Sequence, residues 1–422
     1  MRTLEHWGIR SAAAMVAAMV GGCSSDAGSA ENGDGATTPA EGGSGAEVRS
    51  DAGQADTRPG AAEDAAFPPP VDADTDAASD SSASLGDSGA PPRDSGSLPP
   101  VDSEAGSSES GAETSDSSAA SACGVVPINP KATQQAKNLL CYLHNQYGNH
   151  VLSGQQETSW VSNPDVDTNY IFASTGKYPV IRGGDFLYTN GTTARAQAWW
   201  DAGGIPMLCY HMGAPPLGDS YANTMVAAAG GIDAVLTPGT ASYKSFIQKL
   251  DYAAGELLTL QAANVAVLWR PLHEAGGSWF WWSKETGAQY VRLWTFMYDY
   301  FTNTKGLNNL VWLHPYDGSP LSAFFPGKAM VDVGGADTYS TNQPFSSMFA
   351  TTRGIVGTTI PLALHENGAM PDPTNMFAGD AAPWVLFNTW AGYETSANSL
   401  TFLKSVYANP NTVTRNEVPS LK

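Results

Sequence analysis

Two glutamates, Glu274 and Glu366, close strongly apolar segments and could carry acid–base chemistry. Glu274 ends the run VAVLWRPLHE (265–274), and Glu366 ends the run IPLALHE (360–366). Segments this apolar are unlike surface loops, so we expect each carboxylate at the end of a buried strand. A protonated and an ionised carboxyl group on either side of a cleft can cleave a glycosidic bond. The simpler alternative for either glutamate is a structural salt bridge, for which Arg270 is available.

The elements that must position these carboxylates are short apolar runs alternating with helical patterns. Such runs, separated by helices, indicate parallel strands covered on their outside. Eight of them within residues 123–422 predict a (β/α)₈ barrel. An open doubly wound sheet is the alternative, but the chain has no glycine-rich turn after the first run and no cofactor fingerprint. The predicted strands are His150–Leu152, Pro179–Ile181, Ile205–Tyr210, Val265–Leu268, Leu310–Leu313, Met330–Val333, Pro361–Leu364 and Trp384–Phe387. The predicted helices include Ser242–Ala263, Gln289–Thr302 and Ser396–Tyr407.

Polar and aromatic side chains follow nearly every one of these runs. In a (β/α)₈ barrel the carboxyl ends of the strands converge on one face, where active sites are built. The sequence therefore predicts a polar cleft lined with aromatic rings, which suits a sugar because pyranose faces stack on rings while their edges need hydrogen bonds. The side chains concerned are Ser153–Gln156, Arg182–Asp185, His211, Arg270–Glu274, His314, Asp337–Tyr339, His365–Asn367 and Asn388–Trp390.

The segment WRPLHEAGGSWFWW (269–282) resembles the signature segment of glycoside hydrolase family 26, which consists chiefly of β-mannanases. The resemblance continues in the family's order through GLNNLVW (306–312), Asp332 to Tyr339, and ALHENG (363–368). It covers residues 130–410.

The resemblance implies a (β/α)₈ fold, cleavage with net retention, and no metal or other cofactor. By motif, Glu274 at the fourth strand is the general acid/base and Glu366 at the seventh is the nucleophile. His273 would hydrogen-bond near the nucleophile or the sugar. Tyr339 would hydrogen-bond Glu366 and help to keep it ionised and aimed.

Five further residues match positions at the family's substrate site. His211 matches a sugar-binding histidine at subsite −1, and Trp390 matches the aromatic floor of that subsite. Trp279 would face the +1 sugar. Asp332 and Asp337 match acidic positions near the sixth strand that orient catalytic neighbours.

The sequence departs from the family pattern at three positions. His365 precedes the predicted nucleophile, where a smaller or neutral residue is expected, and its charge could shift the pH profile. Cys209-Tyr210-His211 stands where the family usually has Trp before His, and Ser283 replaces an expected glycine. The change directly before His211 weakens any inference about subsite preference.

The first 122 residues differ in composition from the rest. Residues 1–23 resemble a lipoprotein signal peptide, with an apolar run (12–20) ending in VGGC, so Cys23 is the predicted lipidation site. Residues 24–122 contain 20 acidic and 3 basic residues and few large apolar ones, which predicts a disordered linker. Residues 123–422 would form the catalytic barrel. Cys123 and Cys141 could form a disulfide, and Cys209 is expected as a buried thiol.

We interpret the chain as a retaining endo-β-1,4-mannanase acting on mannan or galactomannan. The alternatives are hydrolysis of β-1,3-xylan or mixed-linkage β-glucan, transglycosylation, and non-catalytic glycan binding. Expected partners are the polysaccharide and, through the lipid, a membrane, with an exported monomer at the outer membrane or cell surface. An acidic chain without a basic patch makes nucleic acid a poor partner.

Overall fold

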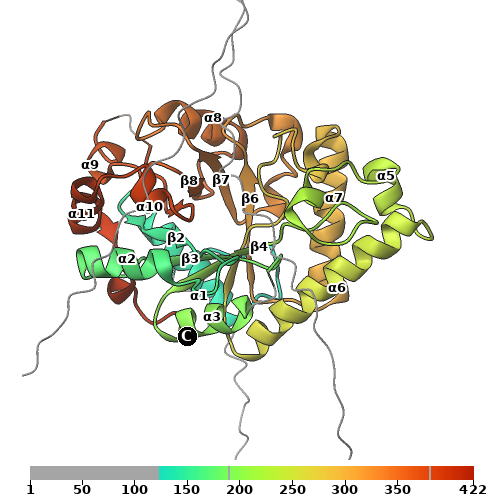
Figure 1. Cartoon of the computed structure of the whole chain (residues 1–422), viewed down its shortest axis with the longest axis horizontal. Helices are drawn as coiled ribbons and strands as arrows, with labels where there is room; N and C mark the ends of the chain where they lie inside the picture. Colours follow the sequence, from blue (N-terminus) through green and yellow to red (C-terminus); the bar gives the residue numbers. More distant parts are fainter. Residues whose placement is uncertain (1–122, 189–190, 380–381) are drawn as a thin grey trace, which may run out of the picture. The chain divides into compact units, whose positions relative to one another are not determined.

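The computed structural model describes residues 123–188, 191–379 and 382–422, and its centre is a closed barrel of eight parallel strands (Figure 1). β9 closes the barrel on β2 through Gln155 and Thr389. The predicted (β/α)₈ barrel is therefore confirmed, and the open doubly wound sheet is wrong. In barrel order the strands are β2 (Gly154–Gln156), β3 (Ile181–Asp185), β4 (Ile205–Cys209), β5 (Val267–Trp269), β6 (Leu310–Tyr316), β7 (Val333–Thr338), β8 (Leu362–Asn367) and β9 (Phe387–Thr389).

Helices alternate with the strands and surround the barrel (Figure 1). The α-helices are α1 (Gln134–Gln146), α2 (Val166–Thr175), α3 (Thr192–Asp201), α4 (Tyr221–Thr224), α5 (Gly231–Leu236), α6 (Ala241–Ala262), α7 (Gly287–Asp299), α8 (Ser346–Val356), α9 (Pro373–Met376), α10 (Tyr393–Ser396) and α11 (Leu400–Ala408). The shorter helical turns are η1 (Trp281–Ser283), η2 (Tyr300–Thr304), η3 (Ser322–Phe324), η4 (Lys328–Met330) and η5 (Arg415–Glu417).

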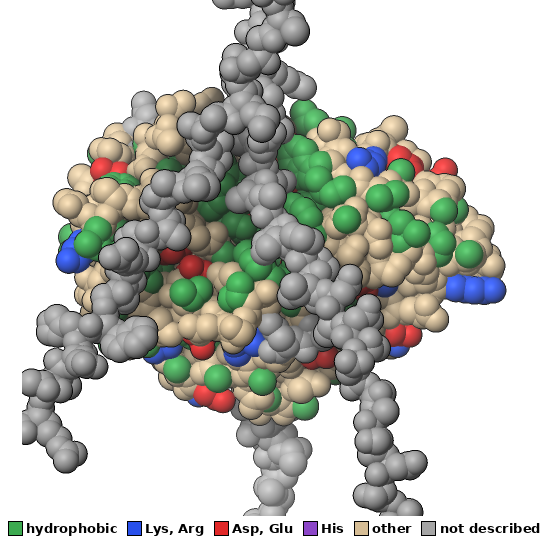
Figure 2. Space-filling model, in the orientation of Figure 1, with side chains coloured by type: hydrophobic (Ala, Val, Ile, Leu, Met, Phe, Trp, Pro, Cys, Tyr) green, Lys and Arg blue, Asp and Glu red, His purple; other side chains and the backbone are tan. Residues whose placement is uncertain are grey.

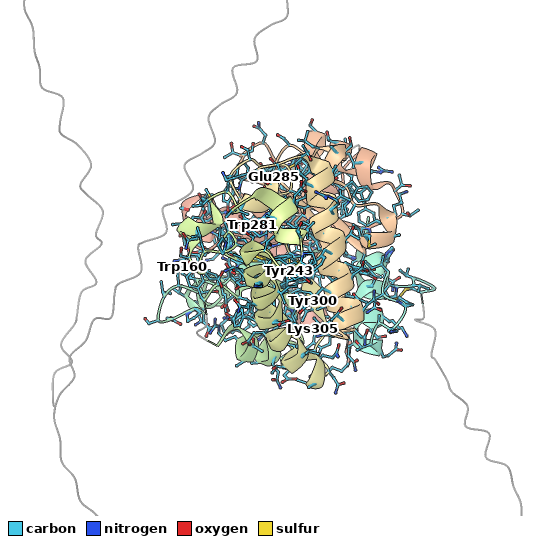
Figure 3. All side chains as sticks on the ribbon, turned by 90° about the vertical axis from the view of Figure 1, so that its right-hand side faces the viewer. Trp160, Tyr243, Trp281, Glu285, Tyr300 and Lys305 are labelled. Carbon is cyan, nitrogen blue, oxygen red and sulfur yellow. A yellow bond between two sulfur atoms is a disulfide. The ribbon has the colours of Figure 1, made fainter. Side chains whose placement is uncertain are left out.

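Helices α6 and α7 lie side by side outside the barrel (Figure 3). Each begins at a threonine whose side chain accepts a backbone N–H of the first turn, Thr240 for α6 and Thr286 for α7. The predicted helices at 242–263 and 289–302 are thus found with boundaries shifted by a few residues. At the end of α7 the chain continues as the π-helix η2, where Tyr300 donates a hydrogen bond of 2.5 Å to Asp251 on α6.

The predicted first strand, His150–Leu152, is wrong as a barrel strand. Val151–Leu152 forms β1, which pairs with β10 (Thr412–Val413) in a separate two-stranded sheet. The barrel begins instead with β2, whose sequence Gly-Gln-Gln has no apolar side chain and so lacks the pattern of a buried strand. The glycine is required here, because a Cβ on Gly154 would lie 2.3 Å from the carbonyl oxygen of Phe387.

The cysteines are arranged as one disulfide and one buried thiol. Cys123 and Cys141 are bonded, which ties the first described residue to α1. Cys209 is free and buried, as expected. The predicted signal peptide (1–23), its lipidated Cys23 and the predicted linker (24–122) lie outside the described residues. In the part that is described, no helix is both long and apolar enough to cross a membrane.

Candidate active site

Glu274 lies in the loop after β5, and neighbouring side chains hold this loop in a left-handed conformation. Backbone φ is +49° at Leu272 and +57° at Glu274, a region that costs non-glycine residues about 1–3 kcal/mol each. Tyr290 donates a hydrogen bond of 3.0 Å to the carbonyl of Leu272, and the Trp282 indole donates one of 2.8 Å to the carbonyl of His273. Strain maintained in this way is typical of functional sites.

Glu366 lies near the carboxyl end of β8, and both its oxygens accept hydrogen bonds. Arg270 donates from Nη1 to Oε2 at 2.8 Å, and the hydroxyl of Tyr339 donates to Oε1 at 2.6 Å. The contact with Tyr339 is the one that the family motif implies. Because the donors come from two different loops, the carboxylate is held in position from two sides.

Arg270 also contacts two residues at which the sequence departs from the family pattern. Nε2 of His365 lies 2.9 Å from the carbonyl of Tyr316 and must donate to it, so Nδ1 accepts from Arg270 at 3.2 Å. Burial and the positive charge of Arg270 hold the pKa of His365 well below its usual value. The expectation that a charge on His365 shifts the pH profile is therefore wrong. Cys209 accepts a 3.5 Å contact from Arg270, and burial raises the pKa of its thiol.

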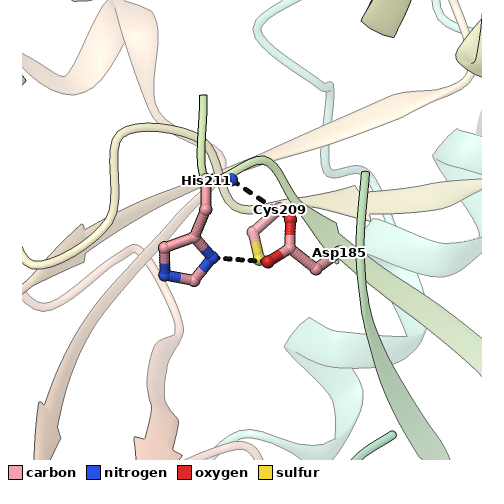
Figure 4. A group of neighbouring side chains, drawn as sticks. All are labelled: Asp185, Cys209 and His211. Carbon is pink, nitrogen blue, oxygen red and sulfur yellow. Dashed lines mark hydrogen bonds and ion pairs between the residues drawn. The ribbon is translucent and has the colours of Figure 1, made fainter. Parts of the chain in front are cut away.

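His211, after β4, contacts Asp185 (Figure 4) and also contacts His273. Its Nδ1 lies 2.5 Å from Oδ2 of Asp185, and its Nε2 lies 2.9 Å from Nε2 of His273. His273 thus contacts the other histidine, and no contact with Glu366 is recorded for it among the described residues. Burial, followed by repulsion from a protonated His211 and from Arg270, lowers the pKa of His273 well below its usual value, so this ring is neutral.

Two groups of side chains bring metal-binding atoms together: Asp185, Cys209 and His211, and Asp337, His365 and Glu366. Both groups border Arg270, whose guanidinium contacts Cys209 in the first and His365 and Glu366 in the second. Its positive charge opposes a cation, and hydrogen bonds already occupy most of the ligand atoms. We therefore interpret both groups as parts of the hydrogen-bond network around Arg270 and not as metal sites.

Asp337, near the end of β7, is a third buried carboxyl group close to the two glutamates. Burial, and then the negative charges of Glu274 and Glu366, raise its pKa well above the usual value. Its Oδ2 atom has no hydrogen-bond partner among the described residues. Asp337 pairs in register with Glu366, and Ala275, next to Glu274, bridges to Tyr316, which pairs with Ala336. The three carboxyl groups therefore lie at the same end of neighbouring strands.

Asp332 does not join them. It precedes β7, at the end of the barrel opposite to Asp337. Its two carboxylate oxygens accept the backbone N–H groups of Ile128 and Trp312 at 2.8 and 2.9 Å. The expectation that Asp332 contacts substrate or orients a catalytic neighbour is therefore corrected: it ties the chain before α1 to β6.

Comparison with known proteins identifies the family of the chain. A family-wide profile described as "Glycosyl hydrolase family 26" matches residues 128–417. The chain belongs to this family. Mannan endo-1,4-beta-mannosidase B of Piromyces sp is 31% identical over 315 residues, which are 69% of this chain and 53% of that protein. A mannan endo-1,4-beta-mannosidase of Bacillus subtilis is 32% identical over 252 residues, 54% of this chain and 70% of that protein. The chain spans about half the length of the first two curated relatives, from Piromyces sp.

Solved structures give the same result for the family 26 barrel. The β-mannanase from a symbiotic protist of the termite Reticulitermes speratus, complexed with a gluco-manno-oligosaccharide, superposes with a TM-score of 0.64 at 28% identity. That match covers 70% of this chain and 98% of the other. The Podospora anserina GH26-CBM35 β-(1,4)-mannanase gives a TM-score of 0.63 at 30% identity, covering 70% of this chain and 69% of the other.

Aromatic rings lie beside Glu274 and beside His211. Trp279 donates its indole N–H to Oε2 of Glu274. Trp390, after β9, stacks on Trp160 with ring centres 6.1 Å apart and also faces His211 at 6.4 Å. Sequence reasoning missed Trp160, which follows the unrecognised strand β2. A tryptophan four residues after the polar run Ser153–Gln156 was the available signal.

Proposed function

We propose that this chain is a retaining endo-β-1,4-mannanase that hydrolyses mannan or galactomannan. The observation that carries the proposal is the environment of Glu366, a carboxylate held by Arg270 and Tyr339 in the same site as Glu274. A structural salt bridge would need Arg270 alone. The additional tyrosine, the strained loop of Glu274 and the adjacent tryptophans fit glycosidic cleavage better.

The proposed reaction has two steps. Glu366 attacks the anomeric carbon and forms a glycosyl ester, while the glycosidic C–O bond breaks and Glu274 gives its proton to the departing oxygen. Glu274, now a carboxylate, takes a proton from water. The water oxygen then bonds to the anomeric carbon and Glu366 leaves as a carboxylate. This mechanism calls for carboxyl groups about 5–5.5 Å apart.

The choice of mannan rests on the names of the relatives, which are mannan endo-1,4-beta-mannosidases. The alternatives keep the same two glutamates but act on β-1,3-xylan or mixed-linkage β-glucan, transfer the sugar to another sugar, or bind glycan without cleavage. Arg270 and Tyr339 both hold Glu366, a nucleophile that a pure binder would not need.

The test is reducing-sugar release on linear mannan, galactomannan, β-1,3-xylan and mixed-linkage glucan, with Glu366→Ala alongside. We expect activity on the mannans alone and its loss in the variant, with the fold retained by circular dichroism. Glu256→Ala, on the outer helix α6, is the matched control and should keep activity. Activity only on another polymer would keep the proposed mechanism but make that polymer the substrate. A wild type inactive on all four polymers would contradict an enzymatic role. Chromatography of the products separates hydrolysis from transfer.

We also propose, from the sequence, that Cys23 is lipidated and anchors an exported monomer to a membrane. The apolar run before Cys23 and the acidic composition of residues 24–122 support this. Labelling with a radioactive fatty acid should mark the wild type but not Cys23→Ser. Equal labelling of the two proteins would disprove it.

A further inference from the structure

A hollow of about 500 Å³ lies between the loop after β6 and the loop after β7. Its lining includes the buried Pro320 and Phe345 and the exposed polar residues Ser319, Ser340 and Ser347. In Figure 2, hydrophobic side chains gather on the upper middle of the face shown, over β6, β7 and β8 of Figure 1, and most Lys and Arg lie at its margin. Because both loops follow barrel strands, the hollow belongs to the end of the barrel that carries the site.

The first wall of the hollow is attached to the loop of Glu274. The backbone N–H of Asp317 donates to the carbonyl of Ala275 at 3.4 Å. Leu321 lies against Gly276, where a Cβ would be 3.6 Å from its Cδ1 atom. A residue that lines the hollow, Leu321, therefore lies against a glycine two residues after the proposed acid/base.

The second wall starts at Thr338, directly before Tyr339, and continues into α8. In the closed strand order β6 and β7 are opposite to β2 and β3, whereas Trp160 and Trp390 follow β2 and β9. The hollow and the Trp160–Trp390 stack thus lie on different sides of the carboxylates. Because Glu274 protonates the oxygen that leaves with the aglycone, sugar units on its side belong to the aglycone.

The chemistry of the lining favours a neutral sugar. Hydroxyl groups from Ser319, Ser340 and Ser347 surround an apolar floor, and none of the described lining residues is Lys, Arg, Asp or Glu. A pyranose presents C–H faces and hydroxyl edges, which match such a floor and rim. An anionic sugar would find no cation there.

Resting on the proposed function, we infer that this hollow binds one neutral hexopyranose unit of the aglycone part of the substrate. The unit is supplied either by the main chain or by a galactosyl branch, since both present the same ring and hydroxyl chemistry. Recognition would come from the hydroxyl rim, and the loops after β6 and β7 would set which branched substrates are accepted.

The test fills the hollow. Ser347→Tyr places a ring in it, and Ala350→Tyr places the same ring at an exposed position one turn later on α8, outside the hollow. The substrates are linear mannan, galactomannan and an aryl mannobioside, whose aglycone carries no sugar. We expect kcat/KM of Ser347→Tyr to fall about 10-fold on at least one polymer relative to Ala350→Tyr, with the aryl substrate unaffected.

A loss on both polymers identifies a main-chain unit, and a loss on galactomannan alone identifies the branch. Equal behaviour of the two variants on both polymers would overturn the inference. So would a matching loss on the aryl mannobioside, because that substrate leaves the hollow empty. Failure of the proposed function would be visible in the wild type itself, whereas failure of this inference is visible only in the comparison of the variants.

Discussion

The Nε2 atoms of His211 and His273 lie 2.9 Å apart, so one of them donates and the other accepts. Asp185 determines which. Its carboxylate accepts from Nδ1 of His211, and in the neutral form of His211 the Nε2 atom then carries only a lone pair. His273 must then donate from Nε2 to this lone pair. Its Nδ1 atom is left without a proton and has no hydrogen-bond partner among the described residues. Both hydrogen bonds therefore point the same way: His273 donates to His211, and His211 donates to Asp185.

Asp185→Asn should reverse that direction. The amide nitrogen would donate to Nδ1 of His211, Nε2 of His211 would donate to His273, and Nδ1 of His273 would gain the proton. We expect the two imidazoles to exchange tautomers in ¹⁵N NMR spectra and kcat to fall about 10–100-fold, the value of a hydrogen bond to a charged group. Asp251→Asn, on the outer surface of α6, is the control. Unchanged histidine spectra in Asp185→Asn would refute this direction.

Glu274→Ala should affect substrates according to their leaving groups. A leaving group with a low pKa needs little proton donation, so glycosyl transfer from an activated aryl mannoside to the enzyme should remain fast. Cleavage of mannan should fall by 100-fold or more, since general acid catalysis contributes about 10²–10⁴-fold. Pre-steady-state release of the aryl group measures the first step directly. An equal loss on both substrates would contradict the role of Glu274 as the acid.

Tyr339→Phe removes one of the two donors to Glu366 and leaves Arg270 in place. We expect kcat on mannan to fall about 10–100-fold, because a hydrogen bond to a charged group contributes roughly 1.5–3 kcal/mol. KM should change little, since the hydroxyl holds the nucleophile. Tyr393→Phe is a matched control, because Tyr393 packs against Tyr339 with ring centres 5.0 Å apart. A larger effect in KM than in kcat would indicate that Tyr339 binds the sugar instead.

The hydrogen-bonded carboxyl pair of Asp167 on α2 and Glu394 on α10 should make stability depend on pH. Burial and the charge of Asp167 raise the pKa of Glu394 to about 7, so the folded protein holds this proton more tightly than the unfolded chain. The resulting stabilisation is present below about pH 4.5 and is lost as the pH rises through about 7. Glu394→Gln should keep a more constant free energy of unfolding between pH 5 and 8, measured by urea denaturation. Parallel curves for the two proteins would exclude this pair as the cause.

The sequence predicted most of the barrel because an apolar run lies in or directly before each strand from β3 onward, and helical patterns separate several of these runs. It failed at β2, where Gly-Gln-Gln carries no apolar signal and pairing with β3 and β9 decides the structure. β7 was placed too early, since Gly334 and Gly335 supply no side chains to the pattern.

The two glutamates, Tyr339 and His211 could be predicted from motifs at strand ends. Asp332 could not be separated from Asp337 by sequence, because only the register of β7 places the two at opposite ends of the barrel. The partners of His365 and His273 come from strands distant in the chain, so their neutral states follow from contacts that no local pattern encodes.

The disulfide between Cys123 and Cys141 has a mechanical consequence. A pulling force on the chain before residue 123 passes through the sulfur atoms into α1. Residues 124–133 are thereby bypassed, and the force is delivered to a helix packed beside β6. A pull from the amino-terminal side therefore loads α1 directly and leaves the segment between Cys123 and α1 without tension.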